Sequence, residues 1–132
     1  MILILDASAA TEIVLQRKKQ KSFEHYLTEA DWIVSPALFI AEVSNVFWKY
    51  HKLADLPLEQ CEKALEYAIN LPDEYCDDRT LYKEAFALGC KVGKPVYDML
   101  YLVLARRNSG YLLTIDKSFA AEAKKQSIRV IS

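Results

Sequence analysis

The sequence predicts an α/β domain in which helices cover both faces of a parallel sheet. Short, unbroken apolar runs alternate with longer segments of helical spacing along the 132 residues. Strands that are apolar throughout are typical of parallel sheets buried on both faces. The composition, 52% hydrophobic and 27% charged, fits a folded chain with a substantial core. We therefore expect residues 1–132 to form a single domain.

Four apolar runs are the expected strands of this sheet. Helical segments separate them, so neighbouring strands would be joined by crossover connections and would run parallel. The runs are ILIL (2–5), WIV (32–34), YLLTI (111–115) and IRVI (128–131).

Capping signals predict the helices in the middle of the chain. Ser35 as N-cap and Pro36 at the first helical position predict a helix that ends near Tyr50. A second helix is expected from Pro57 to about Asn70.

Two further helices are expected before the third strand. The segment 77–93, DDRTLYKEAFALGCKVG, has helical spacing and ends at Gly93, a residue typical of helix C-termini. The segment 98–107, DMLYLVLARR, is apolar nearly all round, which predicts the central and most buried helix. Its final Arg106 and Arg107 suit the negative end of a helix dipole.

Composition excludes several classes of protein. No apolar run approaches the roughly 18 residues of a membrane span, and the N-terminus lacks the basic segment of a signal peptide. Cys61, Cys76 and Cys90 are odd in number and form no CxxC pair, which indicates reduced thiols in a cytoplasmic protein. His25 and His51 are isolated, so a zinc site is not expected. The net charge of −1 gives no general attraction to nucleic acid.

Two acids stand in the same kind of place. Asp6 follows the first apolar run, and Asp116 follows the third, YLLTI. A structural interpretation is available for both, because an Asp between a strand and a helix often caps the helix. Ser8 and Thr114 could share that capping.

Two more acids lie within otherwise apolar segments. Glu42 belongs to PALFIAEVSNVFW, where we expect it to be largely covered, and a covered carboxylate needs a partner. Asp98 begins the most apolar helix, where the helix dipole alone could also favour an acid.

Together the four acids predict a metal site. In parallel α/β folds, ligands bind at the C-terminal edge of the strands, where Asp6 and Asp116 are expected and to which helices can bring Glu42 and Asp98. Four carboxylates in one place repel one another unless a cation neutralises them. Oxygen ligands without His or Cys suit Mg²⁺ or Mn²⁺, and such sites cleave phosphodiesters with one or two ions.

Four segments resemble, in order, the motifs of PIN-domain nucleases, and most closely those of the VapC-like toxins of type II toxin–antitoxin pairs. The resemblance covers essentially the whole chain. It carries over the metal-ligand role to Asp6, Glu42, Asp98 and Asp116, and a supporting role to Ser8, Asn45 and Thr114. The segments are LDAS (5–8), AEVSNVFWK (41–49), VYDMLYLVLA (96–105) and LLTIDKSF (112–119).

The resemblance also implies a fold, an activity and partners. The fold would be a three-layer α/β/α domain with a central, mainly parallel sheet of four to five strands. The activity would be that of a Mg²⁺- or Mn²⁺-dependent endoribonuclease. The partners would be RNA, a small VapB-like antitoxin that blocks the site, and a second copy of the chain.

The expected mechanism assigns roles to two sets of residues. The four acids would hold one or two ions that activate a water for attack on phosphorus, while Ser8 and Thr114 orient carboxylates or waters. Lys91, Lys94 and Lys117 lie near the expected rim and could hold phosphates, although simple solvation of a surface lysine is the favoured explanation for each of them.

Three alternatives remain open at this point. A receiver domain would need an acidic pair after the first strand and an Asp after the third, but Asp6 stands alone and no mid-chain strand that we expect ends in Asp. A phosphatase of the haloacid dehalogenase type would need Asp-x-Asp, where this chain has Asp6-Ala7-Ser8. A catalytically silent PIN-like interaction module would be favoured by loss of acids, and all four are present.

Overall fold

The computed structural model describes residues 1–132 and contains one five-stranded sheet. All four pairs of neighbouring strands are parallel, as the apolar runs predict. Leu3 in the central strand pairs with Ile33 on one side and Tyr111 on the other. In spatial order the strands are β3 (Glu74–Cys76), β2 (Trp32–Pro36), β1 (Ile2–Leu5), β4 (Tyr111–Leu113) and β5 (Arg129–Ile131).

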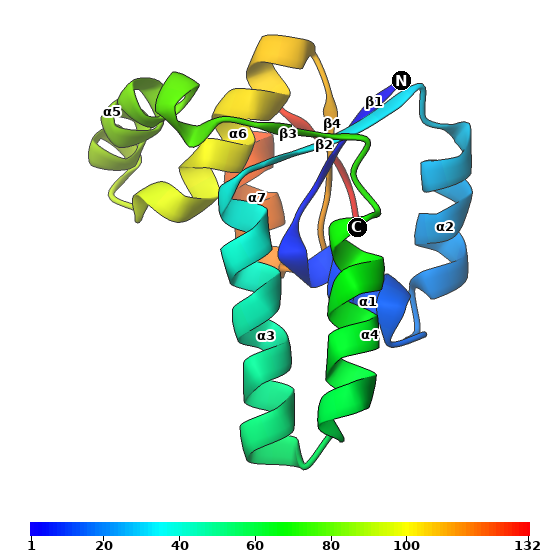
Figure 1. Cartoon of the computed structure of the whole chain (residues 1–132). Coiled ribbons are helices and arrows are strands. Elements are labelled where there is room, and N and C mark those ends of the chain that lie inside the picture. Colours follow the sequence, from blue (N-terminus) through cyan, green and yellow to red (C-terminus); the bar gives the residue numbers. More distant parts are fainter.

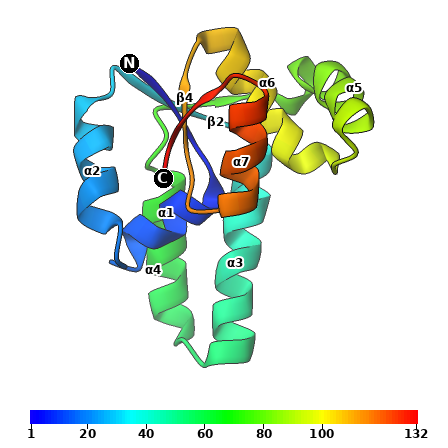
Figure 2. The ribbon, with the colours of Figure 1, turned by 180° about the vertical axis from the view of Figure 1, so that it is seen from behind.

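Helices cover both faces of the sheet, which gives the three-layer α/β/α fold that the sequence predicts. Helices α6 and α7 lie on one side, and α1, α2 and α4 lie on the other (Figures 1 and 2). Helices α3 and α4 form a hairpin that extends beyond the sheet (Figure 1). The helices are α1 (Ala7–Val14), α2 (Gln20–Glu29), α3 (Leu38–Ala54), α4 (Leu58–Ile69), α5 (Tyr82–Val92), α6 (Val96–Asn108) and α7 (Lys117–Lys125), with a short 3₁₀ helix, η1 (Asp78–Thr80), before α5.

Helix α6 is the central helix of the core, as its uninterrupted apolar sequence predicts. Every residue from Met99 to Ala105 is buried. The helix packs against α5 and against strands β1, β2 and β4. Arg106 and Arg107 occupy its last turn, where their charge is favourable.

The strand order reverses direction between β1 and β4. The chain moves from β1 outward to β2 and β3, and then returns to the other side of β1 to form β4 and β5. Loops that follow β1 and β4 therefore diverge at the C-terminal edge of the sheet, and such a switch point is where open α/β sheets bind ligands. Asp6 and Asp116 lie in these two loops.

The predicted start of the helix at Ser35-Pro36 is wrong. Both residues belong to β2, and α3 begins at Leu38. The Ser35 hydroxyl donates a hydrogen bond to the backbone oxygen of Leu5, 2.6 Å away, and so joins β2 to β1 instead of capping a helix. Pro36 is the last residue of the strand, where it pairs with Cys76 of β3.

The apolar pattern does not predict the edge strand β3, and two expected boundaries are shifted. β3 is followed by Asp77 and Asp78, so a mid-chain strand does end next to acids, contrary to the expectation used against a receiver domain. The predicted helix over 77–93 begins as η1 and continues as α5, which ends at Val92 and is capped by Gly93 with a left-handed φ of 72°. The expected strand 111–115 ends at Leu113.

None of the helices combines the length and apolarity that a membrane crossing requires.

Candidate functional site

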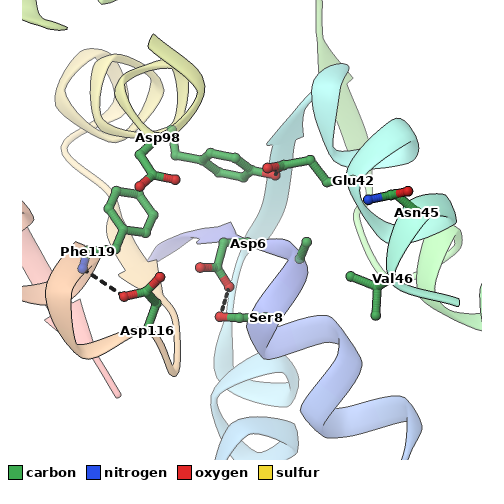
Figure 3. A pocket seen from close by; sticks show the side chains of 10 residues that line it. Asp6, Ser8, Glu42, Asn45, Val46, Asp98, Asp116 and Phe119 are labelled. Atoms are coloured by element: carbon green, nitrogen blue, oxygen red, sulfur yellow. Dashed lines mark hydrogen bonds between the residues drawn. The ribbon is translucent and has the colours of Figure 1, made fainter. Parts of the chain in front are cut away.

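A cavity of about 320 Å³ lies at the switch point of the sheet, and all four predicted acids line it (Figure 3). Each acid comes from a different connection: Asp6 follows β1, Glu42 lies in the second turn of α3, Asp98 is in the first turn of α6, and Asp116 precedes α7. The full lining consists of Asp6, Ala7, Ser8, Glu42, Asn45, Val46, Asp98, Tyr101, Asp116 and Phe119.

Asp6 is the most buried of the four acids of this cavity, and only 5% of its surface is exposed. Its Oδ1 accepts hydrogen bonds from the Ala9 N–H at 2.8 Å and from the Ser8 hydroxyl at 2.7 Å, while its Oδ2 accepts from the Thr114 hydroxyl. Burial raises the pKa of Asp6 from 3.8 to about 6, and the hydrogen bonds only partly oppose this shift. Asp6 is therefore a carboxylate that the metal-free fold ionises with difficulty.

Ser8 and Thr114 connect the loop after β1 to the loop after β4. Their hydroxyl oxygens lie 3.1 Å apart, and both donate to Asp6. Ser8 also accepts the N–H of Ile115 at 3.1 Å, and Thr114 accepts the N–H of Asp116 at 3.0 Å. These bonds fix the two acid-bearing loops relative to each other.

Asp116 lies on the exposed side of the cavity and caps α7. Its Oδ1 accepts the N–H of Phe119 at 3.0 Å, whereas its Oδ2 has no protein donor. Asp6 caps α1 in the same way through Ala9. The sequence offered capping and participation in a site as alternatives for these acids, but the structure shows that a capping carboxylate also lines the cavity.

Glu42 and Asp98 approach the cavity from two helices. Glu42 is half-buried, less covered than the sequence suggests, and its Oε1 accepts a hydrogen bond from the Tyr101 hydroxyl at 2.6 Å. The pKa of Glu42 is raised by burial, with smaller contributions from the charges of Asp98 and Asp78. The pKa of Asp98 is also raised, first by loss of solvent around the carboxyl group and then by the charge of Asp116. Three of the four acids thus resist ionisation in the absence of a cation.

The other predicted residues lie at different distances from the cavity. Asn45 lines the cavity (Figure 3). Lys94 is near enough to Asp98 for its charge to oppose the rise in that carboxyl pKa. Lys117 is exposed at the start of α7 and is not part of the lining. Lys91 borders a separate hollow that also contains Glu84.

Two residues near the cavity were not predicted. Tyr101 lies three positions after Asp98 on α6, a spacing that places both on one helix face, so the sequence did hold a signal for it. Asp78 follows β3, and its Oδ1 is shielded from solvent without a hydrogen-bond partner. No signal was available for Asp78, because β3 itself was not recognised.

The donor set fits a hard divalent cation. No three His, Cys, Asp or Glu side chains are grouped closely enough to enclose an ion by themselves. Mg²⁺ does not require such a cage, because it commonly keeps several waters and binds one or two carboxylates. Glu42 Oε2, Asp116 Oδ2 and both oxygens of Asp98 have no protein donor, so these carboxylate oxygens remain available.

The strand order also separates this fold from a receiver domain. In the flavodoxin-like order found in receivers, the third strand lies beside the first. Here β4 lies beside β1, and β3 is at the far edge. The acids after β3 therefore do not take the place of a phosphoacceptor beside Asp6.

Comparison with known proteins gives matches over nearly the whole chain. A family model described as PIN domain matches residues 3–125. Ribonuclease VapC3 from Pyrobaculum aerophilum is 30% identical over 125 residues, which covers 91% of this chain and 93% of that protein.

Two solved structures share the fold at lower sequence identity. The crystal structure of PAE2754 from Pyrobaculum aerophilum has a TM-score of 0.77 and 20% identity, over 98% of this chain and 92% of that one. VapBC2 from Rickettsia felis, bound to a DNA fragment from their promoter, has a TM-score of 0.70 and 17% identity, over 99% of this chain and 98% of that one.

Proposed function

Because this chain belongs to the PIN domain family, among its VapC-like members, we propose that it is a metal-dependent endoribonuclease and the toxin of a VapBC-like pair. The similar protein from Pyrobaculum aerophilum is named a ribonuclease, which supports hydrolysis of RNA phosphodiester bonds. The similar structure from Rickettsia felis is of a VapBC complex, which supports an antitoxin partner.

The observation that carries the proposal is the convergence of four carboxylates from four separate connections on one cavity. Acids used only as helix caps would not need to face one another. Here burial, with smaller contributions from the charges of neighbouring acids, raises the pKa values of Asp6, Glu42 and Asp98, which is unfavourable for the metal-free fold at neutral pH. Such a cost is typical of a functional site.

We propose Asp6, Glu42, Asp98 and Asp116 as the residues that hold Mg²⁺ or Mn²⁺. The chemistry that such an ion supplies is Lewis-acid activation of water and stabilisation of charge on the phosphate. Ser8 and Thr114 hold Asp6 in place through their hydroxyl groups.

The roles of the other polar residues follow from their positions. Asn45 presents an amide at the cavity wall, and Lys94 supplies a positive charge at the rim that an RNA phosphate can use. All three lysines lie outside the cavity lining, and Lys91 and Lys117 have weaker support because only the charge of Lys94 acts on an acid of the site.

Partners and location complete the proposal. We propose an unpaired RNA segment as substrate, because sequence-specific recognition of RNA by proteins mostly targets single-stranded loops, bulges and ends. We further propose that residues 1–132 act as one domain in a cytoplasmic homodimer, and that a VapB-like antitoxin covers the site.

The test is cleavage of a mixed pool of short, end-labelled RNAs by purified, metal-stripped protein. We expect cleavage with Mg²⁺ or Mn²⁺ and none with EDTA. Asp98→Asn should lose nearly all cleavage, because a neutral amide is a poor ligand for a hard cation. Asp55→Asn is the matched control: Asp55 sits at the α3–α4 turn with a left-handed φ of 54°, which Asn tolerates, and it lies outside the cavity.

Two results would contradict the proposal. Cleavage that persists in EDTA or in Asp98→Asn would exclude the metal mechanism. Absence of cleavage under every metal condition, by folded protein on a pool that includes structured and unstructured RNAs, would favour the silent interaction module instead.

A further inference from the structure

Tyr101 is the largest fully buried side chain of the core, yet it also lines the acidic cavity. Only 1% of its surface is exposed. Its ring packs edge-on against Phe119, with ring centroids 6.2 Å apart. Because the ring is enclosed by other core side chains, its hydroxyl is a hydrogen-bond donor in a fixed position.

The hydroxyl has one partner, Oε1 of Glu42, at 2.6 Å. This is the length expected of a hydrogen bond from a hydroxyl to an ionised carboxylate. Oε2 of the same carboxylate receives no hydrogen bond from the protein. One oxygen of Glu42 is therefore held, and the other is free.

The bond joins two helices that belong to different parts of the fold. Helix α3, which carries Glu42, packs mainly on α4, whereas α6 packs on α5 and the sheet. A glutamate side chain has several rotatable bonds, and an unrestrained one samples many rotamers. A donor fixed in the core removes that freedom at the cavity wall.

We propose that Tyr101 is a positioning residue of the nuclease site, holding Glu42 through Oε1 so that Oε2 is presented to the divalent cation. The inference rests on the proposed function, because it assigns Glu42 as a ligand. Partners that orient a ligand from outside the coordination sphere raise metal affinity without touching the metal. Tyr101 also links this ligand to Asp98, three residues earlier on the same helix, so α6 positions two of the four acids.

The test compares Mn²⁺ binding by metal-stripped parent and Tyr101→Phe, measured by titration calorimetry. The phenylalanine keeps the ring packing and removes only the hydroxyl. We expect the Kd for Mn²⁺ to rise about 10- to 100-fold, the usual effect of losing such a partner. We also expect the metal-free melting temperature to change little more than in the control.

The control is Tyr75→Phe. The Tyr75 hydroxyl donates to the backbone oxygen of Ile69 at the same length, 2.6 Å, and lies away from the cavity. Its loss should leave Mn²⁺ affinity unchanged. The comparison therefore separates loss of a hydroxyl in general from loss of the one that holds Glu42.

A double-mutant cycle identifies the route of the effect. In a Glu42→Gln background, Tyr101→Phe should have little further effect on Mn²⁺ affinity, because its effect passes through Glu42. Equal losses in both backgrounds would show that Tyr101 acts through general structure and would overturn the inference. The cycle also decides the case if Tyr101→Phe proves less stable than expected, since destabilisation alone would appear in both backgrounds.

The possible outcomes separate the inference from the proposed function. If the parent binds Mn²⁺ and cleaves RNA while Tyr101→Phe binds Mn²⁺ equally well, the positioning role is wrong and the nuclease remains. If the parent neither binds Mn²⁺ nor cleaves RNA, the proposed function fails and the role of Tyr101 fails with it.

Discussion

The substitution Asp6→Asn should stabilise the metal-free protein at neutral pH, although it removes a residue of the site. The amide can keep the local hydrogen bonds. Its oxygen can accept from Ala9 and Ser8 as Oδ1 does now. The Thr114 hydroxyl can rotate to accept from the new NH₂ group and to donate to Ser8, whose oxygen is 3.1 Å away.

The magnitude follows from the raised pKa of Asp6. A tenfold change in an ionisation constant corresponds to about 1.4 kcal/mol. Burial raises this pKa from 3.8 to about 6, so keeping Asp6 ionised at pH 7 costs the folded state about 3 kcal/mol. The amide makes weaker hydrogen bonds than a carboxylate, which offsets part of this. We expect Asp6→Asn to raise the free energy of unfolding at pH 7 by about 1–2 kcal/mol.

The same pKa fixes the direction of the pH dependence. Between about pH 4 and 6 the folded state holds a proton on Asp6 that the unfolded chain has lost, so stability falls as pH rises through about 6. Glu42 and Asp98 have raised pKa values and act in the same direction. Asp31 and Asp77 have lowered pKa values, so their contribution is lost only in acid, below about pH 4.

The assay is urea unfolding of metal-stripped protein at pH values from 4.5 to 7.5, followed by tryptophan fluorescence. The parent should lose stability across this range, and Asp6→Asn should lose distinctly less. Asp55→Asn, which changes an exposed carboxylate at the α3–α4 turn, is the control. If Asp6→Asn is less stable than the parent at pH 7, or loses stability with pH as steeply, the buried charge of Asp6 is not a source of instability.

Three further outcomes are expected. Asp116→Asn should keep the cap of α7 and nearly the parental stability, whereas Asp116→Ala should lose about 1 kcal/mol in free energy of unfolding, measured with urea. Both variants should lose metal-dependent RNA cleavage. An Ala variant as stable as the parent would show that the cap is unimportant. Expression of the parent alone should arrest bacterial growth and Asp6→Ala should relieve the arrest, whereas equal arrest at equal abundance on an immunoblot would argue against toxicity by RNA cleavage. Gly89→Ala should lower the melting temperature, at a cost of about 1–3 kcal/mol, because the new Cβ would lie 2.7 Å from the Lys94 carbonyl oxygen; an unchanged melting temperature would mean that the α5–α6 turn adjusts freely.

The central part of the fold could be predicted because its sequence is consistently apolar, which is compatible only with burial. Most of strand β1 and residues 99–105 of helix α6 are buried on every side, and nearly all of these residues are apolar. Such segments have few alternative environments. Their lengths and separation then predict a parallel sheet with crossover helices.

The edges of the fold carry a weaker signal. β3 is three residues long, borders the sheet on one side only, and includes the exposed Glu74. Ser35 and Pro36 have the local chemistry of a helix start, but pairing with Tyr75 and Cys76 of β3 extends strand β2 through both. Tertiary pairing outweighed a local preference there.

The positions of the four acids could be predicted because Asp6 and Asp116 follow strands, while Glu42 and Asp98 lie in the first two turns of helices; the structure places all four around one cavity. The lysines could not be placed, since long exposed side chains have no burial constraint on their position. Tyr101 was missed because it reads as one more core residue of an apolar helix. Only the partner helix shows that its hydroxyl has an acid to hold.

Asp6 and Asp116 each cap a helix and also face the cavity. This combination affects how such a chain can be inactivated by mutation. Both Asp codons become Asn codons by a single base change, and Asn caps a helix about as well as Asp. A cell harmed by the active chain can therefore survive through an inactive variant that still folds and accumulates. Such a variant still binds the protein partner that recognises the surface of the chain. Inactivated alleles at these two positions would persist as competitors for the binding partner of the intact protein, rather than disappear as degraded products.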